Sequence, residues 1–251
     1  MPKFFVTSDI HSFYDELIVA LNDAGFDENN EDHYLVVCGD CWDRGPDSVK
    51  VWKYLKELPR KVLVKGNHEQ LLLDCCERGY PLQHDMSNGT ARTIFHLGYG
   101  IEFDEMCQYT LEKVHPLIDS MVNYFETNNY IFVHSWIPVV NKDGLPAHYT
   151  YGRKFEFNPD WRNASQEDWD AATWGNPFAM ADRGLNQTGK VICFGHWHCS
   201  TGWAKAEGRS EFDEDAKFDP YYGDGFIAID ACTAHSKKCN VVVIEDEFLE
   251  V

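Results

Sequence analysis

The stretch VCGDCWDRGPDS, residues 37–48, places three aspartates, one arginine and two glycines directly after an apolar run. The run, residues 34–37, has the composition of a buried β-strand, so acidic side chains gather where that strand ends. Like charges repel one another, and burying them costs several kcal/mol unless a positive group lies among them. The turn is therefore either solvated or built around a cation, and the other strand ends distinguish the two.

Four further apolar runs, at 4–6, 62–64, 130–133 and 191–194, also stop abruptly at polar side chains. The residues that follow these runs are Asp9 and His11, Asn67 and His68, His134, and His196 and His198. Helical spacing at 12–26 and 46–58 separates the first three strands, which predicts a layered α/β sandwich with central mixed β-sheets flanked by helices. In such folds ligands bind at the carboxyl ends of the strands, so we expect these side chains to converge.

The converging side chains are carboxylates, imidazoles and an amide, which together suit first-row divalent ions such as manganese, iron or zinc. Asp40 lies in the middle of the set and could bridge two ions. Two ions about 3.5–4 Å apart can clamp the attacking and leaving oxygens of a phosphoryl displacement. Cys38 and Cys41 form a C-x-x-C pair, but no second pair completes a zinc site. The pattern therefore predicts a pair of ions held without thiolates.

The composition restricts the class of protein and its partners. At 251 residues, with 44% apolar and 25% charged residues, the chain can bury the core of an ordinary globular domain. A net charge of −19 argues against binding nucleic acid or an anionic membrane surface, but not against a small anion held by a metal. Nine scattered cysteines and an N-terminal stretch without a signal-peptide layout favour reduced thiols and a cytoplasmic location.

The motifs at the strand ends resemble the signature of the calcineurin-like metallophosphoesterase superfamily. They are Asp9-x-His11, Gly39-Asp40-x-x-Asp43-Arg44-Gly45, Gly66-Asn67-His68-Glu69, His134, and Gly195-His196-x-His198. The second and third motifs resemble the serine/threonine-phosphatase branch, which includes phage-type phosphatases and symmetrical dinucleoside tetraphosphatases. The stretch Asn88-Gly89-Thr90 is similar to one in the small bacterial and phage members. The resemblance implies a single metallophosphoesterase domain over 1–251.

The resemblance also implies a ligand set for two ions, for which we expect manganese, with iron or zinc as alternatives. The first ion would take Asp9, His11, Asp40 and His198, and the second would take Asp40, Asn67, His134 and His196. Taken alone, Asp9 and His11 fit a turn with a surface histidine, and asparagine is a common turn residue. The order of all five motifs favours ligands over these readings.

The resemblance assigns catalytic roles to His68 and Asp43, as a proton donor and the carboxylate that orients it. An imidazolium paired with a carboxylate keeps its proton near neutral pH and can give it to a leaving alkoxide. The alternative for Asp43 is an ion pair with Arg44. The residues predicted to bind substrate are Arg44, Lys65, Asn67 and Arg92, with a surface salt bridge as the alternative for Arg92.

The chain departs from the family pattern at Trp174-Gly175-Asn176, where phage and bacterial relatives often carry tryptophan-x-arginine. The replacement for that arginine could be Arg153, Arg162 or Arg183. We expect a helical cap at about 70–128 and a long loop at about 136–182, while 208–225 reads as a solvated loop or hairpin. Tryptophans of the 136–182 segment could stack on a nucleobase, although packing is the commoner fate of tryptophan: Trp136, Trp161, Trp169 and Trp174.

These observations predict an enzyme that hydrolyses phosphomonoesters by direct attack of metal-activated water, with a phosphoprotein among its candidate substrates. The first alternative keeps the chemistry but changes the substrate to a dinucleoside tetraphosphate or another nucleotide. The second is a catalytically silent binding scaffold, which we would expect to have lost ligands or the pair of His68 and Asp43. Under both enzymatic hypotheses, the substrate is a phosphorylated small molecule, a nucleotide or a phosphoprotein.

Overall fold

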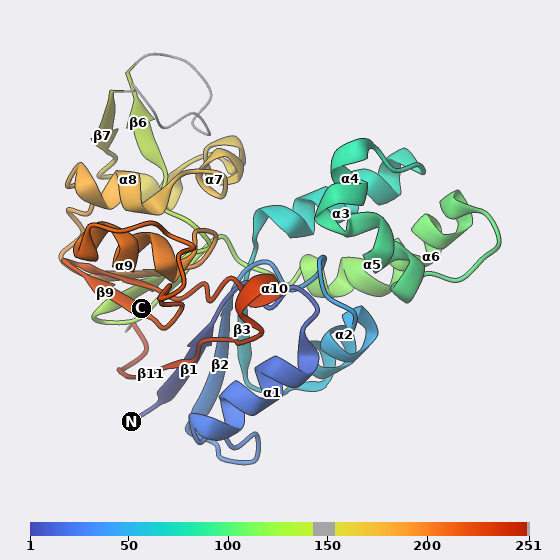
Figure 1. Cartoon of the computed structure of the whole chain (residues 1–251), viewed down its shortest axis with the longest axis horizontal. Helices are drawn as coiled ribbons and strands as arrows, with labels where there is room; N and C mark the ends of the chain where they lie inside the picture. Colours follow the sequence, from blue (N-terminus) through green and yellow to red (C-terminus); the bar gives the residue numbers. More distant parts are fainter. Residues whose placement is uncertain (143–153, 250–251) are drawn as a thin grey trace.

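Two β-sheets lie face to face at the centre of the computed structural model, which describes residues 1–142 and 154–249 (Figure 1). The first sheet has the order β11-β1-β2-β3. Its parallel strands are β1 (Lys3–Thr7), β2 (His33–Cys38) and β3 (Lys61–Val64), and β11 (Val242–Glu245) pairs antiparallel with β1. The parallel strands therefore all end at the same edge of this sheet.

The second sheet has the order β4-β5-β8-β10-β9 and is mixed in the same way. Its three central strands are parallel, and the two outer strands pair antiparallel with their neighbours. The strands are β4 (Phe125–Glu126), β5 (Tyr130–Phe132), β8 (Val191–Phe194), β10 (Phe226–Ala228) and β9 (Tyr221–Gly223). The predicted α/β class with mixed sheets is confirmed.

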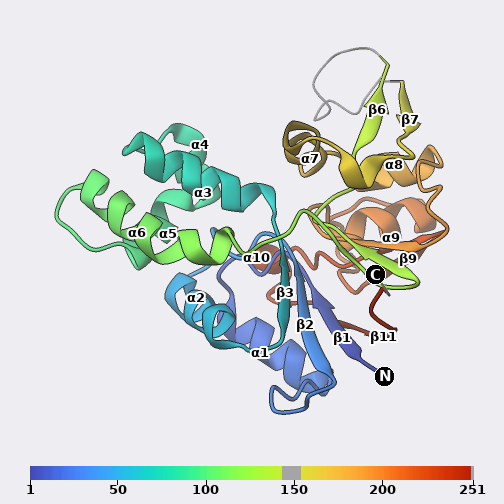
Figure 2. The same ribbon diagram turned by 180° about the vertical axis from the view of Figure 1, so that it is seen from behind.

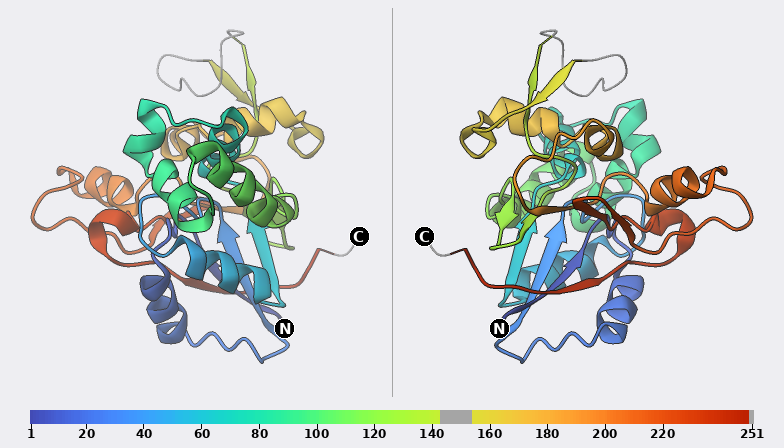
Figure 3. Two further views of the ribbon diagram at one scale, coloured as in Figure 1. Left: turned by 90° about the vertical axis from the view of Figure 1, so that its right-hand side faces the viewer. Right: turned by 90° about the vertical axis from the view of Figure 1, so that its left-hand side faces the viewer.

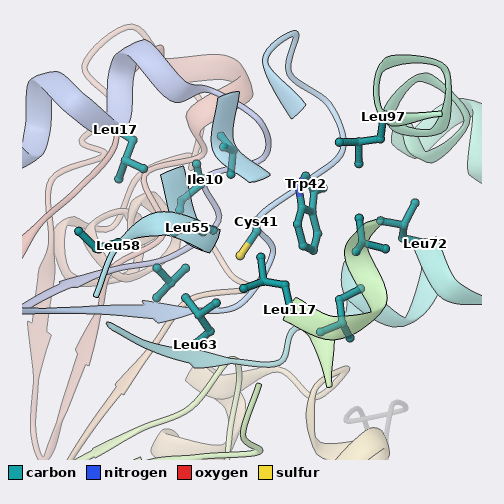
Figure 4. Packing of buried hydrophobic residues seen from close by; sticks show 14 of the residues in the cluster. Ile10, Leu17, Cys41, Trp42, Leu55, Leu58, Leu63, Leu72, Leu97 and Leu117 are labelled. Atoms are coloured by element: carbon teal, nitrogen blue, oxygen red, sulfur yellow. The ribbon is translucent and has the colours of Figure 1, made fainter. Parts of the chain in front are cut away.

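Alternation along the strands explains why the sheets pack as layers. In β2, Val36 and Cys38 face the second sheet and join a core with Phe132, whereas Leu35 and Val37 face the helices on the other side. Figure 4 shows part of the outer core, a single cluster that includes Leu17, Leu55 and Leu63 together with Cys41 and Trp42 of the turn after β2. Each fully buried aliphatic side chain contributes about 1.5–3 kcal/mol to the free energy of folding, so this packing stabilises the turn after β2.

Helices cover the outer faces of both sheets. Helices α1 (Tyr14–Asp23) and α2 (Ser48–Glu57) pack against the first sheet, and α9 (Cys199–Glu207) follows β8 of the second. Figure 2 shows a separate helical group beside β3. It consists of α3 (Asn67–Arg78), α4 (Gln83–Asn88), α5 (Thr90–Leu97) and α6 (Phe103–Ile118). These helices occupy most of the segment predicted as a cap.

The described part of the segment 136–182 contains regular elements where the sequence predicts a long loop. They are β6 (Val139–Asn141), β7 (Phe155–Phe157), the 3-10 helix η1 (Trp161–Asn163), α7 (Gln166–Ala172) and α8 (Pro177–Asp182). The prediction of a loop is wrong there because Trp161 and Trp169 pack around Tyr124, a contact that periodicity does not reveal. Figure 3 places β6 and β7 at the opposite end of the molecule from α1.

Candidate metal centre

Six parallel strands, three from each sheet, deliver polar side chains to one region. Backbone hydrogen bonds join the loops after β1 and β2, from Asp9 N to Gly39 O (3.1 Å) and from His11 N to Asp40 O (3.0 Å). The backbone N–H of His196 donates to the Asp9 carboxylate at 2.9 Å, which joins the second sheet to the first. The predicted convergence of the first, second and last motifs is therefore present in the structure.

The backbone at this region adopts the left-handed conformation at several non-glycine residues. Asp9 (φ 49°), His11 (φ 47°), Asp40 (φ 56°), Asp43 (φ 73°) and His196 (φ 63°) all have positive φ. Such conformations cost about 1–3 kcal/mol each and persist where surrounding contacts hold them. The strained residues therefore include four predicted metal ligands and Asp43, the predicted partner of His68, as expected of a functional site.

Asp40 lies between two groups of histidines. Its Oδ2 is 3.7 Å from His11 Nε2 and 3.9 Å from His68 Nε2, while its Oδ1 is 3.4 Å from His134 Nε2. Within the described residues, Asp40 is shared by two sets of side chains whose ligand atoms lie close enough to hold an ion: His11 with His68, and His134 with His196. This position suits the bridging role predicted for Asp40.

The chemistry of the donors fits divalent cations. His11 Nδ1 lies 2.7 Å from the carbonyl of Trp42 and donates to it, which leaves a lone pair on Nε2. That nitrogen is buried, has no hydrogen-bond partner, and lies 3.9 Å from Asp9 Oδ1. A buried imidazole nitrogen without a partner is costly unless something binds it, and metal-binding histidines are commonly fixed by a carbonyl in this way. The residues present therefore fit the ions that the sequence predicts.

Buried carboxylates crowd the same centre. Burial raises the pKa of Asp9 well above its ordinary value, and the neighbouring carboxylates of Asp230 and Asp40 raise it further. Burial would also raise the pKa of Asp40, but the surrounding imidazoles, His134 foremost, hold it well below the ordinary range. A cation between these groups favours the charged form of each of them.

The third motif forms the first turn of α3 rather than a loop before it. Asn67 Oδ1 lies 2.8 Å from His134 Nε2, and His134 Nδ1 lies 2.8 Å from the Cys38 carbonyl. His68 Nδ1 lies 2.7 Å from Asp43 Oδ2. Burial would lower the pKa of His68, but the carboxylates of Asp40 and Asp43 outweigh it and the pKa is raised. The geometry suits a protonated imidazole.

Asp43 is fixed by two hydroxyl groups of the helical group. Thr90 Oγ1 donates to Asp43 Oδ2 at 2.6 Å, and Thr93 Oγ1 donates to Oδ1 at 3.0 Å. Arg44 does not pair with Asp43 in any of these contacts, and its Nη2 lies 3.3 Å from His68 Nε2. The Asn88-Gly89-Thr90 stretch therefore helps to hold the carboxylate that contacts His68, since it supplies one of these hydroxyls and the turn between α4 and α5.

His198 stands apart from both sets of ligand atoms. Its Nε2 lies 4.0 Å from Asp230 Oδ2 and its Nδ1 lies 3.0 Å from Glu211 Oε1. Asp230 is buried and follows β10, and sequence reasoning missed it as a site residue. The signal was present, because the run FIAID ends in an aspartate like the other strands that reach this region.

Glu69 is a second residue that sequence reasoning missed. Its Oε2 accepts hydrogen bonds from the backbone N–H groups of Gly66 (2.8 Å) and Asp40 (3.0 Å), and its Oε1 accepts from Cys41 (2.8 Å). The side chain is fully buried. Glu69 therefore locks the start of α3 to the turn after β2. Gly66 allows this close approach, because a Cβ there would overlap the Asp40 carboxylate.

The predicted substrate-binding residues differ in their surroundings. Arg44 is exposed beside His68, and Arg92 donates to the Arg44 carbonyl at 3.1 Å. Lys65 Nζ donates to Gln70 Oε1 at 2.7 Å. Among the hydrogen bonds described, this one is made away from His68 and the predicted ligands. Asn67 faces His134, as given above.

Of the three candidates for the missing arginine, the two within the described residues have other contacts. Arg162 donates two hydrogen bonds to Glu126, at 2.8 and 2.6 Å, so its guanidinium is already committed. Arg183 lies over the Phe155 ring at 5.6 Å, and Arg153 lies outside the described residues. Asn176 accepts from Ala179 N at 3.0 Å and caps α8. A helix cap therefore stands where the resemblance to the family led us to expect an arginine.

The chain is similar to known proteins in sequence and in fold. The family model for calcineurin-like phosphoesterases matches residues 2–200. A symmetrical bis(5'-nucleosyl)-tetraphosphatase of Buchnera aphidicola is 44% identical over 70 residues, which cover 28% of this chain and 24% of that protein. An asymmetrical bis(5'-nucleosyl)-tetraphosphatase of Bacillus velezensis is 38% identical over 72 residues, which cover 25% of this chain and 29% of that protein. These alignments span about a quarter of each relative's length.

A solved structure resembles the whole fold. The cold-active protein-tyrosine phosphatase of a psychrophilic Shewanella species superposes with a TM-score of 0.57 at 17% identity. The match covers 98% of this chain and 76% of that one, and at this identity it speaks for the fold alone. Because the family model spans most of the sequence, the chain belongs to the calcineurin-like phosphoesterase family. Within the described residues, no helix is long and apolar enough to cross a membrane.

Proposed function

We propose that this protein is a phosphoesterase that uses two divalent ions to hydrolyse phosphomonoesters. The observation that carries the proposal is the position of Asp40 between two groups of histidines whose ring nitrogens lie close enough to its carboxylate to hold ions. Ions bound there, with manganese as the preferred metal, would supply Lewis acidity and activate the attacking water. Asp9, His11, Asp40 and His198 are the proposed ligands of the first ion, and Asp40, Asn67, His134 and His196 those of the second.

The chain's own residues perform the remaining work. Arg44, exposed beside His68, binds the non-bridging oxygens of the phosphoryl group, for which a planar guanidinium is suited. His68 donates a proton to the leaving oxygen, and Asp43 keeps the imidazole oriented and charged while it does so. The presence of this pair argues against a silent scaffold, which would be expected to have lost it: His68 Nδ1 lies against Asp43 Oδ2, and two threonine hydroxyls anchor that carboxylate.

A nucleotide substrate is the second candidate, and one side chain favours it. Of the four tryptophans considered for stacking, Trp136, Trp161 and Trp169 are buried, whereas Trp174 is 42% exposed. The Trp174 ring lies 6.5 Å from the His196 imidazole. Ser135 donates to the Gly175 carbonyl at 2.8 Å, which fixes the turn that presents the indole. An indole held at the edge of the centre suits stacking on a nucleobase.

The test is a comparison of substrates on one purified sample with manganese. An aryl phosphate, a phosphopeptide, a diester and a dinucleoside tetraphosphate are assayed side by side. The proposal predicts metal-dependent release of phosphate from the aryl phosphate, and loss of that activity in Asp40→Asn with the fold retained. Selective loss of dinucleoside hydrolysis in Trp174→Ala, with aryl phosphate hydrolysis intact, supports the nucleotide candidate. Absence of turnover on all four substrates by the metal-loaded protein contradicts the proposal and favours a scaffold.

A further inference from the structure

The acidic segment 209–220, between α9 and β9, contacts the proposed ligand His198 through Glu211 and Phe212. Glu211 Oε1 lies 3.0 Å from His198 Nδ1 and accepts a 3.1 Å hydrogen bond from the hydroxyl of Ser200. The adjacent Phe212 packs against the His198 ring, with centroids 5.7 Å apart. The segment is therefore attached to the site at this point, although the sequence alone predicts only a solvated loop or hairpin.

The contact determines which nitrogen of His198 carries the proton. A neutral imidazole has one N–H, and a carboxylate beside Nδ1 can only accept, so the proton belongs on Nδ1. Nε2 then keeps a lone pair, and this nitrogen points toward the carboxylates of the centre, 4.0 Å from Asp230 Oδ2. Ser200 donates to the same oxygen of Glu211 and so holds it in place.

We propose that Glu211 is a positioning residue that sets the tautomer and the ring orientation of His198 for binding the first ion. The inference rests on the proposed function only in taking His198 as a ligand. Carboxylates that accept from the second nitrogen of a metal-binding histidine raise its basicity, and their loss commonly weakens metal binding about 10–100-fold. Loss of Glu211 should weaken binding of the first ion only. His134 and His196, the proposed ligands of the second ion, have no contact with Glu211 among the bonds described.

The test is a manganese titration of the full chain, with free ion counted by electron paramagnetic resonance. Glu211→Ala weakens one of two binding events about 10–100-fold and leaves the other unchanged. Glu211→Gln restores much of the affinity, because its amide oxygen still accepts from Nδ1. The matched control is Glu214→Gln, which removes a carboxylate from an exposed position of the same segment and leaves both events unchanged.

A second measurement reports the tautomer without any metal or substrate. Nitrogen NMR of the metal-free protein, in which the neutral imidazole is observed, places the His198 proton on Nδ1 in the wild type and in Glu211→Gln. In Glu211→Ala the signal moves toward the Nε2–H form. Equal loss of both binding events, an unchanged tautomer, or a wild type that binds fewer than two ions overturns the proposal. Intact two-ion binding without turnover defeats only the proposed function.

Discussion

The most specific chemical role proposed for a single side chain at the centre is that of His68 as a proton donor. Replacing it with asparagine in His68→Asn removes the proton donor but keeps a polar group of similar size. We expect turnover to fall by about 10²–10⁴ for substrates with poor leaving groups, because their oxygen needs a proton as it departs. The loss is much smaller for a nitrophenyl ester, whose leaving oxygen is stable without one.

The check is a plot of turnover against the pKa of the leaving group for wild type and His68→Asn. The wild type shows a shallow dependence and the variant a steep one. Parallel lines would remove the role of His68 as a proton donor and leave it a structural or substrate-binding residue.

The metal ligands predicted from the sequence all come shortly after an apolar run. Asp9, Asp40 and His134 could be found because an apolar run marks the strand and a polar residue marks its end. Glu69 and Glu211 could not be found in this way. Their roles depend on which backbone groups and imidazole the fold brings against them, and nothing in the local pattern records that.

At the element scale, the side chain of Glu69 connects the start of α3 to the turn after β2. Glu69 accepts three backbone N–H groups, one from Gly66 and two from the turn. In Glu69→Gln the new NH₂ group faces N–H donors that it cannot satisfy. We expect the free energy of unfolding to fall by about 1.5–3 kcal/mol, measured by urea denaturation of the metal-free protein.

The matched control is Glu77→Gln, an exposed change on the same helix, which should leave the unfolding free energy within about 0.5 kcal/mol of the wild type. Equal stability of Glu69→Gln and wild type would show that the turn after β2 holds its shape without this carboxylate.

The edge of the second sheet is stabilised by a carboxylate in β4. Glu126 accepts from Arg162 and forms an ion pair with Lys190 at 2.8 Å. Burial would raise the pKa of Glu126, but these two cations outweigh it, so the pKa is lowered from its ordinary value of 4.5. A carboxylate with a lowered pKa stabilises the fold above its unfolded pKa and loses that contribution as pH falls through the folded value.

We therefore expect Glu126→Gln to cost about 1.5–3 kcal/mol at neutral pH and progressively less below about pH 4. Urea denaturation of wild type and variant across this range measures the difference between them. A difference that grows as the pH falls has the wrong sign and would contradict the assignment.

The elements themselves were predictable where their pattern was local. The runs that became β1, β2, β3, β5 and β8 were marked by short apolar stretches, and α1 and α2 by helical spacing. The segment 136–182 was not, because Trp161 and Trp169 reach their partner Tyr124 through tertiary packing. Short elements joined by asparagine and proline leave no period to detect in the sequence.

Taken as a whole molecule, the fold brings strand ends from two sheets to one place. A sandwich whose sheets are joined by the bond from His196 N to the Asp9 carboxylate can hold ligands from both halves within one site. The net charge of −19 makes this concentration of carboxylates unfavourable without cations, since self-repulsion adds to the cost of burial. The layered class and the convergence of the strand ends were predictable because both depend on strand order. The position of an exposed side chain such as Trp174 beside His196 was not, because it depends on tertiary packing.

The most direct measurement is anomalous diffraction at the manganese edge from crystals soaked with Mn²⁺. Two peaks about 3.5–4 Å apart, with the Asp40 carboxylate between them, are expected. One would lie beside His11 and the other beside His134 and His196. A single peak, or none within coordination distance of Asp40, would contradict the account.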